Sequence, residues 1–174
     1  NVLASKAGRA VAGAQTWAVS GPQASDAVLR IGAAPAGRSV LLVQTTAAVQ
    51  LGRFALERLL AVQAATGAGW LYSDYTTAAD GRRQAHPTID CQAGSLRDDF
   101  DFGPLVLLDG VARRQAAAEL RRDRFAHAGL YALRLAVSRR APVVRLGEPL
   151  YTVVETGSQG SGEGGFAYVD ARNR

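Results

Sequence analysis

The sequence predicts a three-layer α/β domain with a mainly parallel central sheet. Three near-continuous apolar runs, at residues 39–44, 69–75 and 104–108, are typical of strands that are buried on both faces. Apolar residues at helical spacing lie between the first two runs, and strand, helix, strand is the pattern of a parallel βαβ unit. The 174 residues are enough for one domain with a sizeable core.

The N-terminal elements are short. A strand is expected at residues 16–19, and a helix over residues 24–31 follows the chain break at Gly21-Pro22. The apolar run SVLLVQ at residues 39–44 then predicts the first buried strand. Strands and helices therefore alternate from the start, as in an α/β protein.

The segment after this strand is the clearest helix. Its apolar residues recur at three- and four-residue spacing, and Gly67 provides a C-terminal stop. The apolar face consists of Leu51, Phe54, Ala55, Leu59 and Val62. The second buried strand, at residues 69–75, follows directly and completes the βαβ unit.

The C-terminal half continues the alternation. After the buried strand at residues 104–108, residues 111–122 and then residues 128–139 are expected to form two helices. Two short strands are expected at residues 141–144 and 149–154.

A Gly-rich segment separates the domain from the last residues. We expect residues 1–155 to form the domain, and residues 156–174 to be a flexible loop followed by a C-terminal segment. Residues 156–165, TGSQGSGEGG, lack the Gly-Lys-Ser/Thr ending of a phosphate-binding loop. They are expected to be a connector, and a lid over a substrate is the alternative.

The composition excludes several classes of protein. The net charge of +5 is carried almost wholly by Arg, which suits diphosphates or anionic lipids, but aromatic residues do not interleave with the arginines as in a nucleic-acid platform. No run of apolar residues is long enough to predict a transmembrane helix. Cys91 is the single cysteine, a buried thiol or, less commonly, a nucleophile. We expect no nucleic-acid partner, and a cytoplasmic location or one at the inner face of the membrane.

Carboxylates are crowded in one stretch of the chain. Asp74 follows the apolar run at residues 69–75, and Asp98, Asp99 and Asp101 fall within four residues. Like charges at close range raise one another's pKa, so such crowding favours a cation, a diphosphate–metal complex or a polar substrate.

Four sequence motifs follow one another along the chain. They are WLYSDY at residues 70–75, HPTIDCQAGSLRDDFDFG at 86–103, FGPLVLLDGVARRQAAAEL at 102–120, and RFAHAGLYALRLAVSRRAPVVRLGEPLYTVV at 124–154. Together, over about residues 14–155, they resemble family 2 glycosyltransferases with the GT-A fold, and the second motif is similar to a Bacteroides-type branch.

This resemblance implies a GT-A-like, Rossmann-like domain over residues 1–155 and an inverting transfer reaction. The donor would be a nucleotide-diphosphate sugar, and the acceptor hydroxyl would belong to an unknown glycan or lipid-linked molecule in cell-surface polysaccharide or glycan synthesis. The family's strand-end carboxylates hold a divalent metal, Mn or Mg, which the resemblance assigns here to Asp74. A turn aspartate is the alternative for Asp74.

The sequence departs from the family pattern at three places. The opening strand that grips the nucleotide base is missing, so we expect the chain to be part of a longer protein. The Asp-x-Asp motif is reduced to Asp74, and the Glu-Asp pair that supplies the base is replaced by His127-Ala128-Gly129. A non-catalytic GT-A-like binding or assembly module of a larger enzyme is therefore the alternative function. Another nucleotide-binding α/β domain is a third, and the absence of GxGxxG argues against dinucleotides.

Other residues are candidates for the base and for substrate contacts. Asp98, Asp99, Asp101 or His127 would deprotonate the acceptor hydroxyl. His86 and Arg97, with Asp74, would bind substrate. The alternatives are that Arg97 pairs with one of the carboxylates while the others are solvated, and that His86 is a neutral surface residue.

Overall fold

The computed structural model describes residues 2–4, 16–35, 37–92, 94 and 99–155. Its main sheet contains β3 (Val40–Val43), β4 (Ala48–Leu51), β5 (Trp70–Ala79), β6 (Arg82–His86), β7 (Leu105–Leu108) and β8 (Val143–Val154). The helices are α1 (Ser25–Gly32), α2 (Ala55–Thr66), α3 (Gly110–Glu119) and α4 (Gly129–Ser138), with a 3-10 turn η1 (Leu120–Arg122) after α3. Strands β1 (Val2–Ala4) and β2 (Thr16–Ala18) form a separate parallel pair.

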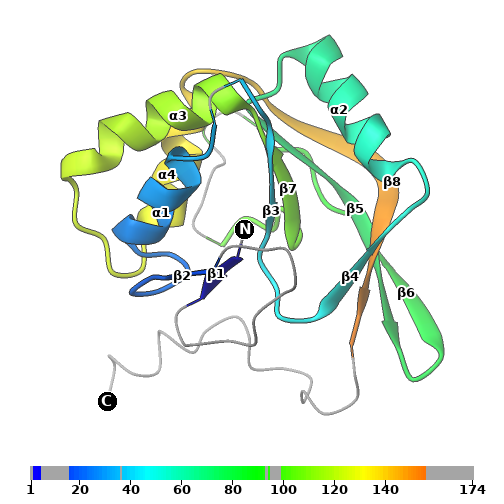
Figure 1. The fold of residues 1–174 in the computed structure, drawn as a ribbon. Coiled ribbons are helices and arrows are strands. Elements are labelled where there is room, and N and C mark those ends of the chain that lie inside the picture. The colour runs from blue at the N-terminus through cyan, green and yellow to red at the C-terminus, as the bar shows by residue number, and fades with distance from the viewer. Residues whose placement is uncertain (1, 5–15, 36, 93, 95–98, 156–174) are drawn as a thin grey trace.

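The main sheet curls into a half-barrel (Figure 1). Its strand order is β3-β7-β5-β8-β4, and β6 pairs with the far end of β5. Only β5 and β8 are parallel among the described pairs of this sheet; the other pairs are antiparallel. The prediction of a mainly parallel, three-layer Rossmann-like (GT-A-like) sheet is therefore wrong.

The prediction failed because an apolar run identifies a strand but not the direction in which it pairs. The three runs do become β3, β5 and β7 of one sheet, as expected. However, β7 lies between β3 and β5 and runs antiparallel to both, so the predicted βαβ neighbours are not paired. A strand buried on both faces, such as β7, has an apolar run whichever way it runs, and half-buried β3 has one too, so the pattern does not reveal strand direction.

Two elements are longer than the sequence indicated. Strand β5 does not end at Tyr75 but continues to Ala79, and a tight turn leads into β6. Asp80 and Gly81 both have positive φ, 48° and 74°, as a two-residue hairpin turn with the matching twist requires. The two short strands expected at residues 141–144 and 149–154 are one twelve-residue strand, β8.

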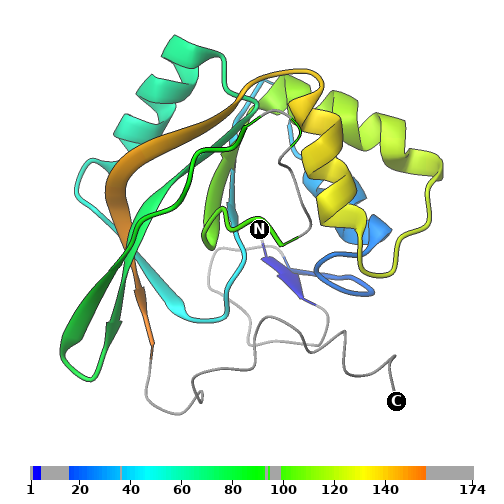
Figure 2. The same ribbon diagram turned by 180° about the vertical axis from the view of Figure 1, so that it is seen from behind.

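Side chains gather in two cores on the two faces of the sheet. We call the first the half-barrel interior; α2 covers one end of it, and its buried residues are Leu59, Ala68, Leu71, Leu105, Leu107, Tyr151 and Val153. The second, the helical side, lies between the sheet and the helices α1, α3 and α4, which group together in Figure 2. Its largest members include Trp70, Tyr72, Phe102, Val106, Leu108 and Leu133.

Helix α3 is fixed at its start and to its neighbour α1. The Asp109 carboxylate accepts hydrogen bonds from the Val111 and Ala112 N–H groups and so caps the helix. One turn later the buried guanidinium of Arg113 donates to the carbonyl oxygens at the end of α1. These oxygens belong to Ile31, Gly32, Ala34 and Pro35.

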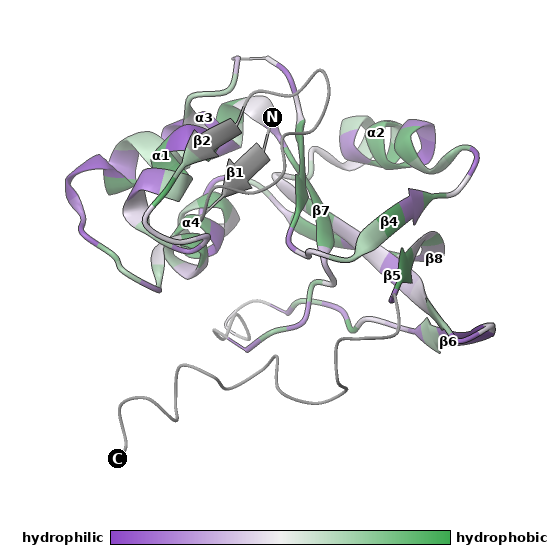
Figure 3. Cartoon of the chain, turned by 60° about the horizontal axis from the view of Figure 1, so that its bottom comes forward, coloured by the Kyte–Doolittle hydropathy of each residue, from purple (hydrophilic) through white to green (hydrophobic). Residues whose placement is uncertain are grey.

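Hydropathy follows this architecture (Figure 3). Strand β7, which contributes to both cores, is hydrophobic, and the far end of the β5–β6 hairpin is hydrophilic. Among the described residues, every helix is too short or too polar to span a bilayer. The Gly-rich segment at residues 156–165, the possible lid, lies outside the described residues, as does the whole of 156–174.

Candidate functional site

Asp74 lies at an irregular point of strand β5. The edge of β5 that pairs with β7 through Trp70–Tyr72 pairs with β6 from Tyr75 onward, so Asp74 faces the gap between these partners. On the other edge, the register with β8 shifts on both sides of Asp74. Such bulges turn a side chain out of the regular alternation and are frequent beside active sites.

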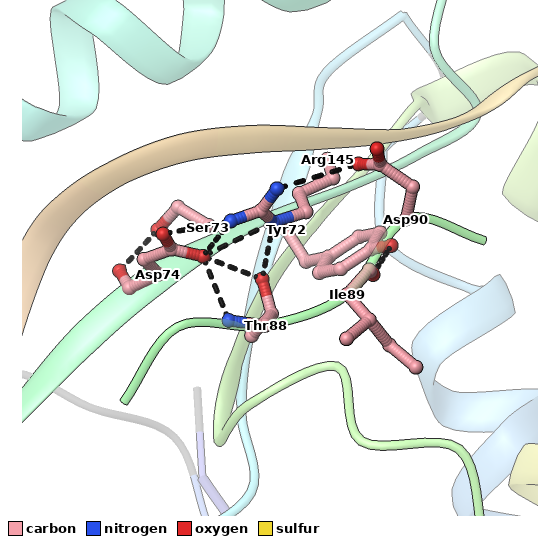
Figure 4. Close-up of polar contacts among 7 residues, drawn as sticks. All are labelled: Tyr72, Ser73, Asp74, Thr88, Ile89, Asp90 and Arg145. Carbon is pink, nitrogen blue, oxygen red and sulfur yellow. Dashed lines mark hydrogen bonds and ion pairs between the residues drawn. The ribbon is translucent and has the colours of Figure 1, made fainter. Parts of the chain in front are cut away.

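An arginine from β8 holds the Asp74 carboxylate (Figure 4). Arg145 Nη2 lies 2.9 Å from both Oδ1 and Oδ2 of Asp74, and Arg145 Nε lies 3.1 Å from Oδ1. The side chain of Asp74 is only 13% exposed and that of Arg145 is 22% exposed. This charge-assisted contact fixes the guanidinium plane as well as its position.

The loop after β6 completes what we call the Asp74 cluster, namely Asp74, Thr88, Asp90 and Arg145. The N–H and the hydroxyl of Thr88 both donate to Asp74 Oδ1, at 2.8 and 2.7 Å. Arg145 Nε also lies 3.0 Å from the Thr88 hydroxyl oxygen, and Arg145 Nη1 lies 3.5 Å from Asp90 Oδ1. Buried Thr88 therefore contacts both Asp74 and Arg145, whereas Asp90 contacts Arg145 from the exposed side of the cluster.

Tyr72, on β5, holds the loop after β6 through two hydrogen bonds. Its hydroxyl donates to the Ile89 carbonyl oxygen at 2.6 Å and accepts the Cys91 N–H at 3.0 Å. Burial raises the pKa of Tyr72 to about 12, so the hydroxyl keeps its proton near neutral pH. Cys91 itself is half-buried and packs against the helical side.

The surroundings keep Asp74 charged. Partial burial pushes the pKa of this carboxyl up, but the Thr88 hydrogen bonds and the Arg145 guanidinium outweigh burial, so the pKa lies below its ordinary value of 3.8. Asp74 in turn raises the pKa of Arg145. The pair is thus a fixed carboxylate next to a fixed cation.

This arrangement does not fit the divalent metal that the motif implied for Asp74. Both carboxylate oxygens already accept hydrogen bonds from Arg145, and Oδ1 accepts two more from Thr88. Within the described parts of the chain, no three His, Cys, Asp or Glu side chains are grouped to hold an ion. Hard divalent cations need several such oxygen ligands.

The run of carboxylates is only partly described. Asp98 and Arg97 lie outside the described residues, and Asp99 and Asp101 are exposed. Asp101 Oδ1 accepts the Gly103 N–H at 2.7 Å. Burial raises the pKa values of Tyr75 and Tyr151, and the charge of Asp101 raises both further, so Asp101 lies near these two rings. None of the described contacts joins Asp101 to Asp74 directly.

The two histidines lie in different surroundings. His86 ends β6, stacks on Tyr75 with ring centroids 4.8 Å apart, and shares a 2.9 Å hydrogen bond with the Thr77 hydroxyl. His127 is exposed in the turn before α4, near Gly129, whose N–H donates to the Gln23 carbonyl oxygen beside α1. His127 therefore lies with the helices, and His86 lies along the strands.

Sequence reasoning missed the residues that hold Asp74. Arg145 comes from a strand 71 residues away, and Thr88 from a loop 14 residues away. One signal was available: Arg145 is a lone charge within the apolar run VVRL, where a buried strand normally tolerates a charge only if it is paired.

A scan against protein-family models and a search of curated proteins both found no match for this chain. The resemblance to family 2 glycosyltransferases therefore stays a prediction from the motifs.

Proposed function

We propose that the chain acts as a glycosyltransferase that moves a sugar from a nucleotide-diphosphate donor to an acceptor hydroxyl, with inversion, in glycan synthesis. The observation that carries the proposal is the Asp74–Arg145 pair, because it holds a fixed cation from β8 beside the WLYSDY strand β5. Phosphate oxygens are among the preferred partners of a guanidinium.

Arg145 has one nitrogen available for a ligand. Nε and Nη2 are engaged by Asp74 and Thr88. Among the described residues, Nη1 has only the 3.5 Å contact with Asp90, a side chain that is 77% exposed. A donor diphosphate would replace Asp90 there, and a cation held in advance stabilises the charge that develops as the diphosphate leaves.

The transfer step needs a base. The acceptor oxygen would attack the anomeric carbon as the bond from that carbon to the diphosphate oxygen breaks, and the hydroxyl proton would pass to a carboxylate. Among the described candidates, Asp101 is an exposed carboxylate near Tyr75 and Tyr151. Asp99 is a second exposed carboxylate, and His127 lies with the helices instead.

The alternative, a binding or assembly module without transfer activity, has its own support. Helix α4 has no acidic residue in its first turn, where the resemblance places the base. Arg145 also neutralises the remaining motif carboxylate, Asp74. The transferase requires both donor binding and turnover, whereas a module used for binding or assembly requires no turnover.

Titration calorimetry with UDP-glucose, UDP-N-acetylglucosamine and GDP-mannose, with and without manganese, tests donor binding. We expect one donor to bind without manganese. Arg145→Ala is expected to weaken this binding about tenfold or more, and Arg145→Lys to restore part of it. Asp90→Ala is expected to tighten binding about threefold, because it removes the competing carboxylate. Arg58→Ala, which removes an exposed ion pair with Glu148, is the control.

Three results would contradict the proposal: no donor binds, Arg145→Ala binds as the unaltered chain does, or Asp90→Ala weakens binding. Binding that requires manganese and is lost in Asp74→Asn would instead restore the metal role of Asp74. Release of nucleotide diphosphate in the presence of an acceptor separates the transferase from the binding module.

A further inference from the structure

A cavity of about 610 Å³ lies along the β5–β6 hairpin. Its polar lining consists of Thr77, Asp80, Arg82, Gln84, His86 and Glu155. Cross-strand partners point to the same face of a sheet, and Tyr75 pairs with His86 as Thr77 pairs with Gln84. Because Tyr75 packs against the half-barrel interior, the cavity opens on that face of the sheet. Its volume is in the range of small-molecule sites, which often lie at the mouths of curled sheets.

The wall of this hairpin cavity is held in place before any ligand arrives. His86 stacks on Tyr75 at an interplanar angle of 8°, and Tyr75 stacks on Tyr151 at 6° with centroids 5.4 Å apart. The 2.9 Å hydrogen bond with Thr77 fixes the rotation of the imidazole. A ligand that contacts His86 therefore does not have to order it, which favours binding.

The charges of the lining select the class of ligand. Asp80 and Glu155 would repel a phosphate or another anion, and Arg82 disfavours a free cation. An apolar ligand would leave all these groups without hydrogen-bond partners. A neutral polyhydroxylated molecule suits them, because each hydroxyl both donates to a carboxylate and accepts from a guanidinium or amide.

We propose that the hairpin cavity is a binding site for a neutral oligosaccharide. The side chains that contact its hydroxyl groups are Asp80, Arg82, Gln84 and Glu155, and His86 provides a flat surface for a sugar ring.

This site is separate from the Asp74 cluster. On β8, Val143 packs on the helical side, and Val144 and Leu146 pack in the half-barrel interior. Arg145 therefore points to the helical side, whereas the hairpin cavity opens on the other face of the sheet. Oligosaccharide binding at the hairpin holds whether or not the chain transfers a sugar.

Titration of the chain with maltotriose, cellotriose and chitotriose, followed by calorimetry and by ligand-observed NMR, tests the proposal. We expect at least one of these neutral trisaccharides to saturate the chain below about 10 mM. Arg82→Ala and Gln84→Ala are each expected to weaken binding about tenfold. Arg83→Ala is the matched control, because Arg83 lies on the same strand and its side chain points to the opposite face.

Loss of affinity in Arg82→Ala and Gln84→Ala with unchanged affinity in Arg83→Ala supports the site. The proposal is overturned if none of the three sugars saturates the chain, or if Arg83→Ala weakens binding as much as Arg82→Ala. It is also overturned if inorganic phosphate competes with the sugar, since the two carboxylates exclude anions. Arg82, Arg83 and Gln84 are all exposed, so the three variants are expected to fold.

Discussion

Three hydrogen bonds join Asp74 and Arg145 although 71 residues separate them in the chain. With Thr88 they connect β5, β8 and the loop after β6 at one point. The contact is mostly shielded from water, so its loss has a larger effect than the loss of a surface ion pair.

Asp74→Asn is expected to lower the free energy of unfolding by about 1–3 kcal/mol, because Arg145 and Thr88 lose a charged acceptor in a mostly buried place. Urea denaturation followed by circular dichroism measures the change. Asp90→Asn is the control, since this neighbour of Arg145 is 77% exposed, and its effect is expected to stay within about 0.5 kcal/mol. Equal effects of the two substitutions would show that Asp74 behaves as an ordinary surface aspartate.

The Asp74–Arg145 pair also predicts how the stability of the chain depends on pH. The pKa of Asp74 is below 3.8 in the folded chain, so its stabilisation is complete above the unfolded value and is lost as pH falls through the folded value. The difference in unfolding free energy between the unaltered chain and Asp74→Asn is therefore expected to be constant from pH 7 to about 5 and to shrink below pH 3.8. Urea titrations at several pH values measure it, and a difference that grows in acid contradicts the assignment.

At the residue scale, the sequence singled out one member of the Asp74 cluster. Asp74 was identifiable because a carboxylate inside an apolar run needs a reason to be there. Its partner was not identifiable, because the pairing depends on which strand lies next to β5, and the register with β8 shifts at Asp74 itself. Glycosyltransferase activity, and the roles of Asp98, Asp99, Asp101 and His127 in it, stay predictions.

At the scale of elements, α1 and α3 depend on one side chain. The last carbonyl groups of a helix have no partner within it, and Arg113 provides one for the end of α1. The guanidinium is fully buried. A cation near the negative end of a helix is also favourable electrostatically.

Arg113→Met keeps most of the side-chain volume and is expected to destabilise the chain by about 1–3 kcal/mol, because one buried and three partly buried hydrogen bonds to carbonyl oxygens are lost. Arg114→Met, at the exposed neighbouring position of the same helix, is expected to change stability by less than about 0.5 kcal/mol. Thermal denaturation of both variants makes the comparison. If Arg113→Met is as stable as the unaltered chain, the carbonyl contacts do not stabilise the α1–α3 pair.

Helices were more predictable than strand lengths. The expected helix at residues 24–31 is α1 within one residue, since its apolar spacing and acidic first turn are local features. Strand β4 was missed because Leu51 was assigned to the apolar face of the next helix, whereas it pairs with Tyr151 and is exposed. Local spacing does not reveal a partner strand that is a hundred residues further along the chain.

At the scale of the whole molecule, β5 and β7 belong to both cores. Leu71, Leu105 and Leu107 point into the half-barrel interior. The alternate residues of the same strands, including Trp70 and Val106, point to the helical side. Because neither core can open without disturbing these shared strands, we expect the described domain to unfold in one step.

Leu59→Ala in the half-barrel interior and Leu133→Ala on the helical side test this expectation. Both side chains are fully buried, so each substitution is expected to cost about 2–5 kcal/mol. Urea denaturation followed by near-UV and far-UV circular dichroism should give a single coincident transition for each variant. Two separate transitions, of which Leu59→Ala shifts only one, would mean that the cores are independent.

The parallel pairing of β5 with β8 also has a consequence for the time course of synthesis. Trp70 pairs with Val143, so a ribosome finishes one partner on the order of ten seconds before it reaches the other. During that interval the long edge of β5 is a template for any unpaired strand nearby, from the same or another nascent chain. A translation pause before residue 143 would lengthen this exposure.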